Sequence, residues 1–142
     1  MIALKETGME FETNEIDKAL QAAAEARKNA YAPYSKFRVG AALRASSGEL
    51  YTGCNVENAS YGATICAERG ALMAACAAGD KEFSYIVVVT DVDPPAYPCA
   101  LCRQVLAEFC GPDFIIFTGT PEKIVGRITL GELLPHPFNE IP

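Results

Sequence analysis

The sequence has one histidine, His136, and no tryptophan. His136 stands between Pro135 and Pro137, and a lone histidine in such a loop is more often a surface residue than a ligand or a base. Serine and cysteine nucleophiles are commonly activated by a neighbouring histidine. A hydrolase of that kind would depend on this one residue, so the sequence disfavours the class.

Basic residues are few as well. The chain carries 12 Lys and Arg against 18 Asp and Glu, which gives a formal net charge of -6 at pH 7. Binding to a nucleic acid polymer is driven by clustered Lys and Arg that neutralise phosphates. We therefore expect no nucleic acid partner, and tRNA and single-stranded DNA are disfavoured as substrates.

Long apolar runs are also missing. No window approaches the roughly 20 apolar residues that span a membrane, and residues 1–11 lack the apolar core of a secretory signal. We therefore expect a cytoplasmic protein with no membrane contact. Residues 1–13 are predicted to be a flexible N-terminal segment, and residues 14–142 suit a single domain.

Six cysteines occur in the 142 residues. Without a secretory signal they indicate reduced thiols that bind a metal or pack in the core, and not a disulfide framework. Cys76, in an Ala-rich run, and Cys110, at the end of a helical segment, are expected to be small core residues. Cys54 lies in a predicted strand and is also expected to pack.

The order of predicted elements favours an α/β fold. Asn14 is a plausible cap for the first helix, and Ser46 to Glu49 form a polar turn between two strands. Strand 85–90 is apolar with little alternation, which is typical of a strand buried on both faces. The sequence predicts a mixed, roughly five-stranded sheet with an antiparallel start, parallel crossovers and helices on both faces. The expected helices are 14–29, 66–78, 99–110 and 130–134, and the expected strands are 37–45, 50–56, 85–90, 114–117 and 124–128.

A zinc site is indicated by two short motifs. Cys66 is followed two residues later by Glu68, and Cys99 is separated by two residues from Cys102. Structural zinc sites usually close with four protein ligands, whereas three thiolates leave one position open to water. Both motifs are expected to open helices, where unpaired N–H groups and the helix dipole favour a thiolate.

Glu68 and Arg69 each allow two interpretations. A carboxylate beside a metal-bound water can take its proton, leaving hydroxide, and later return the proton to the substrate; the alternative is a carboxylate that only stabilises its helix start. Three thiolates leave zinc with a formal charge of minus one, so a nearby cation would restore its power to acidify water. Arg69 is the candidate cation, and the alternative is an exposed arginine paired with Glu68 or Asp80.

Four motifs, in this order, resemble the small, homotetrameric cytidine deaminases over about residues 15–138. They are Y-A-P-Y-S-K-F from Tyr31, G-C-N-V-E-N-A-S-Y from Gly53, T-I-C-A-E-R from Thr64, and P-C with C-R-Q-V-L from Pro98 to Leu106. The chain also matches the wider zinc deaminase signature, in which His or Cys precedes x-Glu and Pro-Cys-x-x-Cys follows. The resemblance implies a cytidine deaminase-like catalytic domain, a three-layer αβα sandwich, over residues 14–142.

The resemblance also implies the reaction and its residues. Cys66, Cys99 and Cys102 would bind one Zn²⁺, and hydroxide would attack C4 of cytidine or 2'-deoxycytidine while Glu68 shuttles protons and ammonia leaves. Asn55 and Glu57 would hydrogen-bond the ribose, although polarity after a strand is the alternative for both. Phe37 would pack on the base, and Phe138 would reach the pocket of a neighbouring subunit in a homotetramer; simple packing is the alternative for both rings. The remaining substrate-binding residues implied are Ala59, Tyr61 and Ala67.

Two positions depart from the family pattern. Gly70 stands where Thr is common, and we expect it to serve close packing, because Gly in a helix costs about 1 kcal/mol relative to Ala. Ala100 and Leu101 replace the more usual Gly-Ala between the zinc cysteines. The ligand chemistry is unaffected, but the pocket shape and the substrate preference could differ.

Other functions stay open at this stage. A structural zinc module would add Cys54 as a fourth ligand and catalyse nothing. A deaminase of an aminopyrimidine antibiotic or a nucleotide would keep the chemistry and change the substrate. A phosphate should meet basic pocket residues, and Asn55 and Glu57 offer no such charge, so an unphosphorylated nucleoside fits better.

Overall fold

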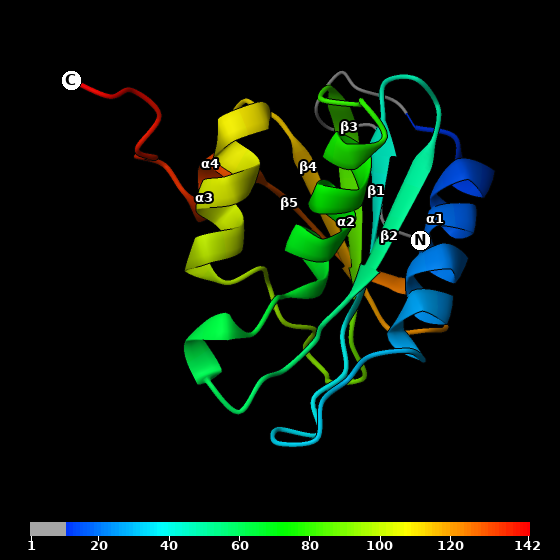
Figure 1. Ribbon diagram of the computed structural model, residues 1–142. Helices are drawn as coiled ribbons and strands as arrows, with labels where there is room; N and C mark the ends of the chain where they lie inside the picture. Colours follow the sequence, from blue (N-terminus) through cyan, green and yellow to red (C-terminus); the bar gives the residue numbers. More distant parts are fainter. Residues whose placement is uncertain (1–10) are drawn as a thin grey trace.

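The computed structural model describes residues 11–142, and in it one mixed sheet lies between two helical layers (Figure 1). The strand order is β2-β1-β3-β4-β5. Helix α1 covers one face, and α2 and α3 cover the other (Figure 1). This confirms the predicted αβα sandwich. The elements are α1 (Thr13–Arg27), β1 (Gly40–Ala45), β2 (Leu50–Cys54), the 3-10 turn η1 (Tyr61–Ala63), α2 (Ala67–Ala77), β3 (Phe83–Val89), α3 (Ala100–Phe109), β4 (Ile115–Gly119), β5 (Ile124–Thr129) and α4 (Leu130–Leu133).

Helix α1 presents one apolar stripe to the sheet. Ile16, Ala19, Leu20 and Ala23 are buried, at the i, i+3, i+4, i+7 spacing of one helix face. They join a core cluster with the side chains of β1, β3 and β4 that point to this face. The predicted Asn14 cap is wrong, because the helix begins one residue earlier and Glu12 holds the N-cap position without a side-chain hydrogen bond.

Strand β1 begins at Gly40, three residues later than predicted. The backbone of residues 37–39 leaves the sheet and borders the functional site described below. A Cβ atom on Gly40 would lie 2.0 Å from the carbonyl oxygen of Ala23, so only glycine lets α1 approach the sheet at this point.

The two crossovers bring two helix starts to one edge of the sheet. Strands β1 and β2 pair antiparallel, as do β1 and β3, so β2 and β3 run in the same direction. Helix α2 connects β2 to β3, and α3 connects β3 to its parallel neighbour β4. Both helices therefore begin beyond the carboxyl ends of their strands, where α/β proteins usually place their sites. The final hairpin, β4 with β5, is antiparallel.

Close packing of α2 on the sheet depends on Gly53. The expectation from the sequence that Gly70 serves this close packing is wrong. A Cβ on Gly53 would lie 2.3 Å from the Ala67 carbonyl oxygen. A Cβ on Gly70 would have its nearest neighbour at 3.6 Å, which is ordinary van der Waals contact. The strand glycine is the position that the helix approach requires.

The predicted flexible segment, residues 1–13, lies largely outside the described residues. Within the described part, Phe11 packs edge-on against Tyr85, with ring centroids 4.8 Å apart. Across residues 11–142, no helix combines the length and the apolar character that a membrane crossing needs.

Candidate metal centre and active site

Three cysteine thiols meet where α2 and α3 begin. Cys66 is the N-cap of α2, Cys99 is the N-cap of α3, and Cys102 lies in the first turn of α3. Their sulfur atoms all lie within 4.8 Å of one another, and those of Cys66 and Cys99 are 3.7 Å apart. Tetrahedral zinc with Zn–S bonds of about 2.3 Å places its sulfurs about 3.8 Å apart, so the three thiols fit one zinc ion.

The protein environment favours a thiolate at Cys66. A hydrogen bond from Cys102, with a smaller contribution from Arg69, lowers the pKa of the Cys66 thiol to about 5, although burial opposes this shift. The Arg69 guanidinium lies with Nη2 3.3 Å from Cys66 Sγ and 3.4 Å from the Thr64 carbonyl oxygen. The alternative of an exposed arginine paired with Glu68 or Asp80 is therefore wrong; Asp80 accepts hydrogen bonds from Ser47 and Tyr51 instead.

The Glu68 carboxyl is buried next to the three thiols. Its residue is only 5% exposed, and the Cys102 thiol donates to Glu68 Oε2 over 3.3 Å. Burial raises the pKa of this carboxyl, because a charged group is less favourable away from water. A carboxyl with a raised pKa at a metal site suits proton transfer in both directions.

A cavity of about 330 Å³ opens onto this group. It is within the size range of small-molecule sites. The buried Glu68 forms its inner end, and two of the three thiol residues, Cys66 and Cys99, also line it. The lining residues are Ser35, Phe37, Val39, Asn55, Glu57, Thr64, Cys66, Ala67, Glu68, Val88, Thr90, Ala96, Tyr97 and Cys99.

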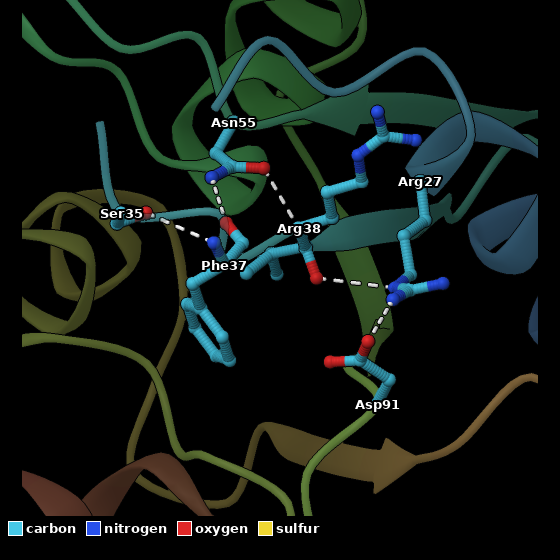
Figure 2. Close-up of polar contacts among 7 residues, drawn as sticks. Arg27, Ser35, Phe37, Arg38, Asn55 and Asp91 are labelled. Carbon is cyan, nitrogen blue, oxygen red and sulfur yellow. Dashed lines mark hydrogen bonds and ion pairs between the residues drawn. The ribbon is translucent and has the colours of Figure 1, made fainter. Parts of the chain in front are cut away.

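Asn55 holds one wall of the cavity in place. Its Nδ2 donates to the Phe37 carbonyl over 2.7 Å, and its Oδ1 accepts from the Val39 N–H over 2.8 Å. Figure 2 shows the Asn55 amide reaching both backbone groups of this segment. Because residues 37–39 form no strand, the buried amide supplies the backbone partners that a neighbouring strand would otherwise give.

Glu57 lies at the outer rim. Its carboxylate accepts hydrogen bonds from the backbone N–H groups of Tyr34 and Ser35 at 3.0 and 3.1 Å, and from the Ser35 hydroxyl at 2.5 Å. The Ser35 hydroxyl bond, with the two backbone bonds, lowers the pKa of Glu57. Lys36, next in the chain, has a φ of 62°, a conformation that non-glycine residues seldom adopt. The rim is therefore a sharply bent loop tied to one carboxylate.

The residues suggested from the sequence divide into two groups. Around one cavity the structure gathers Phe37, Asn55, Glu57, Cys66, Ala67, Glu68 and Cys99, with Cys102 in the adjoining thiol group.

Three suggested residues do not line that cavity in their own chain. Phe138 is 66% exposed, and both of its backbone polar groups are bonded to the side chain of Gln104. Tyr61 is 77% exposed and packs edge-on against Tyr34, and Ala59 is exposed. All three therefore face outward from the described part of the chain.

Sequence reasoning missed Thr90, Tyr97 and the loop residue Ser35. For Thr90 a signal was present, because it is the polar residue that directly follows the buried apolar strand β3. Ser35 could not be recognised, because its role depends on how the loop bends toward Glu57.

A fourth cysteine ligand is not available. Among the described residues, the group that could hold a metal contains Cys66, Cys99 and Cys102, and Cys54 is outside it. The proposed four-sulfur structural module therefore lacks its closing ligand, and a coordination position is left for another molecule.

Comparison with known proteins identifies the family. The model for the cytidine and deoxycytidylate deaminase zinc-binding region matches residues 13–118. This chain belongs to that family. A cytidine deaminase of Halalkalibacterium halodurans is 46% identical over 119 residues, which cover 84% of this chain and 90% of that protein. A cytidine deaminase of Sporosarcina psychrophila is 41% identical over 126 residues, covering 89% and 93%.

Solved structures of the family share the fold. The crystal structure of cytidine deaminase from Burkholderia pseudomallei matches with a TM-score of 0.81 and 46% identity, covering 86% of this chain and 98% of that one. The family model describes a zinc-binding region, and the three thiols here have the spacing of zinc ligands. The chain is thus a zinc-dependent deaminase whose cofactor is one zinc ion.

Proposed function

We propose that the protein hydrolyses cytidine and 2'-deoxycytidine to uridine and 2'-deoxyuridine with release of ammonia, as in pyrimidine salvage. The observation that carries this proposal is the buried Glu68 carboxyl, which lies against three zinc-binding thiols at the inner end of a cavity of small-molecule size. The similarity to named cytidine deaminases supports the choice of substrate.

The chain's own residues divide the reaction between them. Zinc, when bound, supplies a Lewis acid that makes a water molecule more acidic. Glu68 would take one proton from the attacking water and pass it to the ring nitrogen as the water oxygen bonds to C4 of the pyrimidine. The proton left on that oxygen would then pass through Glu68 to the amino group, and the bond between C4 and the amino nitrogen would break. One water is consumed and one ammonia is released. The raised pKa of Glu68 suits this role, because the group must hold a proton between two transfers.

Arg69 is proposed to offset the charge of the thiolates. Its guanidinium donates to Cys66 Sγ, which lowers the electron density that this sulfur gives to a metal. Replacing Arg69 with Gln should keep the zinc and lower kcat, whereas unchanged kcat in a zinc-loaded variant would exclude this role.

The nucleoside is proposed to lie with its base inward and its sugar outward. Phe37, half-buried on the cavity wall, offers a ring face to the base, and the backbone of Ala67 lies beside Glu68 at the inner end. Asn55 and Glu57 present an amide and a carboxylate toward the rim, the groups that bind hydroxyls. Both are already bonded to the 34–39 loop, so their remaining donor and acceptor positions are held in fixed directions.

We propose that active sites are shared between subunits of a homotetramer. Support comes from Ala59, Tyr61 and Phe138, which the resemblance assigns to substrate binding but which face outward in their own chain. Light scattering should give a tetramer, and Phe138→Ala should lower activity while each chain keeps its own zinc. A fully active monomer would contradict the shared site.

Residues 14–142 are proposed to act as one catalytic domain in the cytosol. All six cysteines are free thiols, and the ligand thiols must stay reduced to hold zinc, as a reducing compartment allows.

Product analysis tests the proposed activity. Purified zinc-loaded protein is mixed with cytidine or 2'-deoxycytidine, and nucleosides and ammonia are quantified at intervals. Equal amounts of uridine (or deoxyuridine) and ammonia are expected. An unchanged nucleoside in the presence of bound zinc would exclude this substrate and favour another aminopyrimidine.

A further inference from the structure

The Thr90 hydroxyl is buried in the cavity without a partner. Thr90 is 1% exposed, and its Oγ1 has no hydrogen-bond partner within the described residues. It nevertheless lines the cavity that holds Glu68. Buried hydroxyls normally find a partner, because an unpaired one loses its hydrogen bonds to water without replacement.

Strand direction explains why this side chain reaches the site. Successive residues of a strand point to opposite faces. Ile86 and Val88 join the core cluster beneath α2 and α3, whereas Val87 and Val89 join the cluster beneath α1. Thr90 continues the first series, so its side chain faces the helix starts that carry the thiols and Glu68.

The backbone around Thr90 is held on both sides. The Thr90 N–H donates to the Gly119 carbonyl over 3.0 Å. The next residue, Asp91, forms an ion pair of 2.6 Å with Arg27 at the end of α1. Arg27 Nε also donates to the Arg38 carbonyl over 3.1 Å, and Figure 2 shows Arg27 between Asp91 and Arg38. One arginine thus connects the segment that follows β3 to the Phe37 wall.

We propose that the Thr90 hydroxyl hydrogen-bonds the polar edge of the pyrimidine base when the nucleoside occupies the cavity. A hydroxyl can donate to a ring nitrogen or carbonyl and accept from an amino group, so it suits both the aminopyrimidine substrate and its product. The sugar is a poorer partner, because the carboxylate proposed for it, Glu57, lies at the outer rim, whereas Thr90 continues the series of Ile86 and Val88 that faces the helix starts. This inference rests on the proposed function.

Thr90→Val is the direct test, because it removes the hydroxyl and keeps the shape. The bound base then faces an apolar group, and kcat/KM for cytidine should fall roughly 5- to 100-fold. The loss should be the same for 2'-deoxycytidine, since the sugar is not contacted, and the Kd of uridine should rise in parallel. Zinc content should stay at the wild-type value. The melting temperature should be unchanged or higher, because the free protein loses only an unsatisfied polar atom.

Two further variants separate a binding role from a packing role. Thr90→Ser keeps the hydroxyl and should retain most of the activity. Thr118→Val is the matched control, because Thr118 is equally buried and lies in the neighbouring strand, opposite Val88, outside the cavity lining. It should leave kcat/KM unchanged.

Three results would overturn the proposal for Thr90. The first is a kcat/KM of Thr90→Val within twofold of wild type. The second is a kcat/KM that falls as much in Thr90→Ser as in Thr90→Val. The third is a fall in kcat/KM that accompanies a lower melting temperature in both Thr90→Val and Thr118→Val. A wild-type protein that leaves cytidine unchanged would instead overturn the proposed function.

Discussion

The inner end and the outer rim of the cavity differ in how their polar groups are held. At the inner end, Cys66, Glu68 and Cys102 come from two helix starts, interact with one another, and have protonation states altered by burial and by one another. At the rim, Asn55 and Glu57 bond mainly to the backbone of the 34–39 loop. The inner groups are therefore suited to chemistry, and the rim groups are suited to placing the substrate.

Loss of a thiol ligand should have the largest effect. Cys102→Ala removes one of three protein ligands and opens a space in the buried inner end, so zinc should be lost and activity should fall below detection. Metal analysis and turnover after purification check both. Cys76→Ala is the matched control, since Cys76 packs against the core away from the thiol group. A zinc-free Cys102→Ala protein with normal activity would show that the metal is not needed.

Asn55→Ala should have a large effect as well, although a smaller one than loss of a thiol ligand or of the Glu68 carboxyl. It leaves the Phe37 carbonyl and the Val39 N–H without their partner, so the cavity wall should loosen. We expect kcat/KM to fall by about 10- to 100-fold and the free energy of unfolding to fall by about 1–3 kcal/mol. Kinetics and denaturant unfolding measure the two, with the exposed Asn29→Ala as control. Wild-type kcat/KM with wild-type stability would mean that the amide does not hold the wall.

Glu57→Gln should affect binding more than chemistry. Glutamine keeps an acceptor oxygen for the loop but loses the charge, so KM for cytidine should rise by about tenfold with little change in kcat. Steady-state kinetics with both nucleosides would measure this. A variant that lowers kcat while KM stays constant would remove the distinction between the rim and the inner end.

The smallest expected effect is a pH dependence at the rim. The Ser35 hydroxyl and the loop N–H groups lower the pKa of Glu57 from its ordinary value of 4.5. Because the folded-state pKa is the lower one, the ionised carboxylate stabilises the loop above the ordinary value, and this stabilisation is lost as pH falls through the lowered pKa. KM should therefore rise at the acidic end in wild type. Glu57→Gln should lack this rise in KM. The same dependence of KM on acidic pH in both proteins would contradict the role of the Glu57 charge.

The sequence was more informative about the inner end than about the rim. The thiols and Glu68 occur in two short motifs, and their residue types and helix positions already indicated a metal with a neighbouring proton carrier. The order of elements likewise predicted the layers and the sheet, because apolar strands and Ala-rich helices have local signatures.

The rim depends on contacts between distant segments. Asn55 bonds to backbone groups 16 and 18 residues away. The positive φ at Lys36 occurs at a residue that is not glycine, so the residue type does not predict it. The start of β1 was placed too early for the same reason. Residues 37–39 alternate apolar and polar as a half-buried strand does, but the Asn55 side chain holds this segment. The approach of Arg69 to Cys66 was open to two interpretations until the helix turn fixed its direction.

Glu68 is proposed to transfer protons at a zinc site that it does not help to build. The most direct test is the ultraviolet absorbance change of cytidine mixed with wild type and with Glu68→Gln, after both are shown to contain one zinc per chain. We expect rapid loss of the cytidine band in wild type and a rate lower by roughly 10²- to 10⁴-fold in the variant, at equal zinc content. Wild-type turnover by zinc-loaded Glu68→Gln would contradict it.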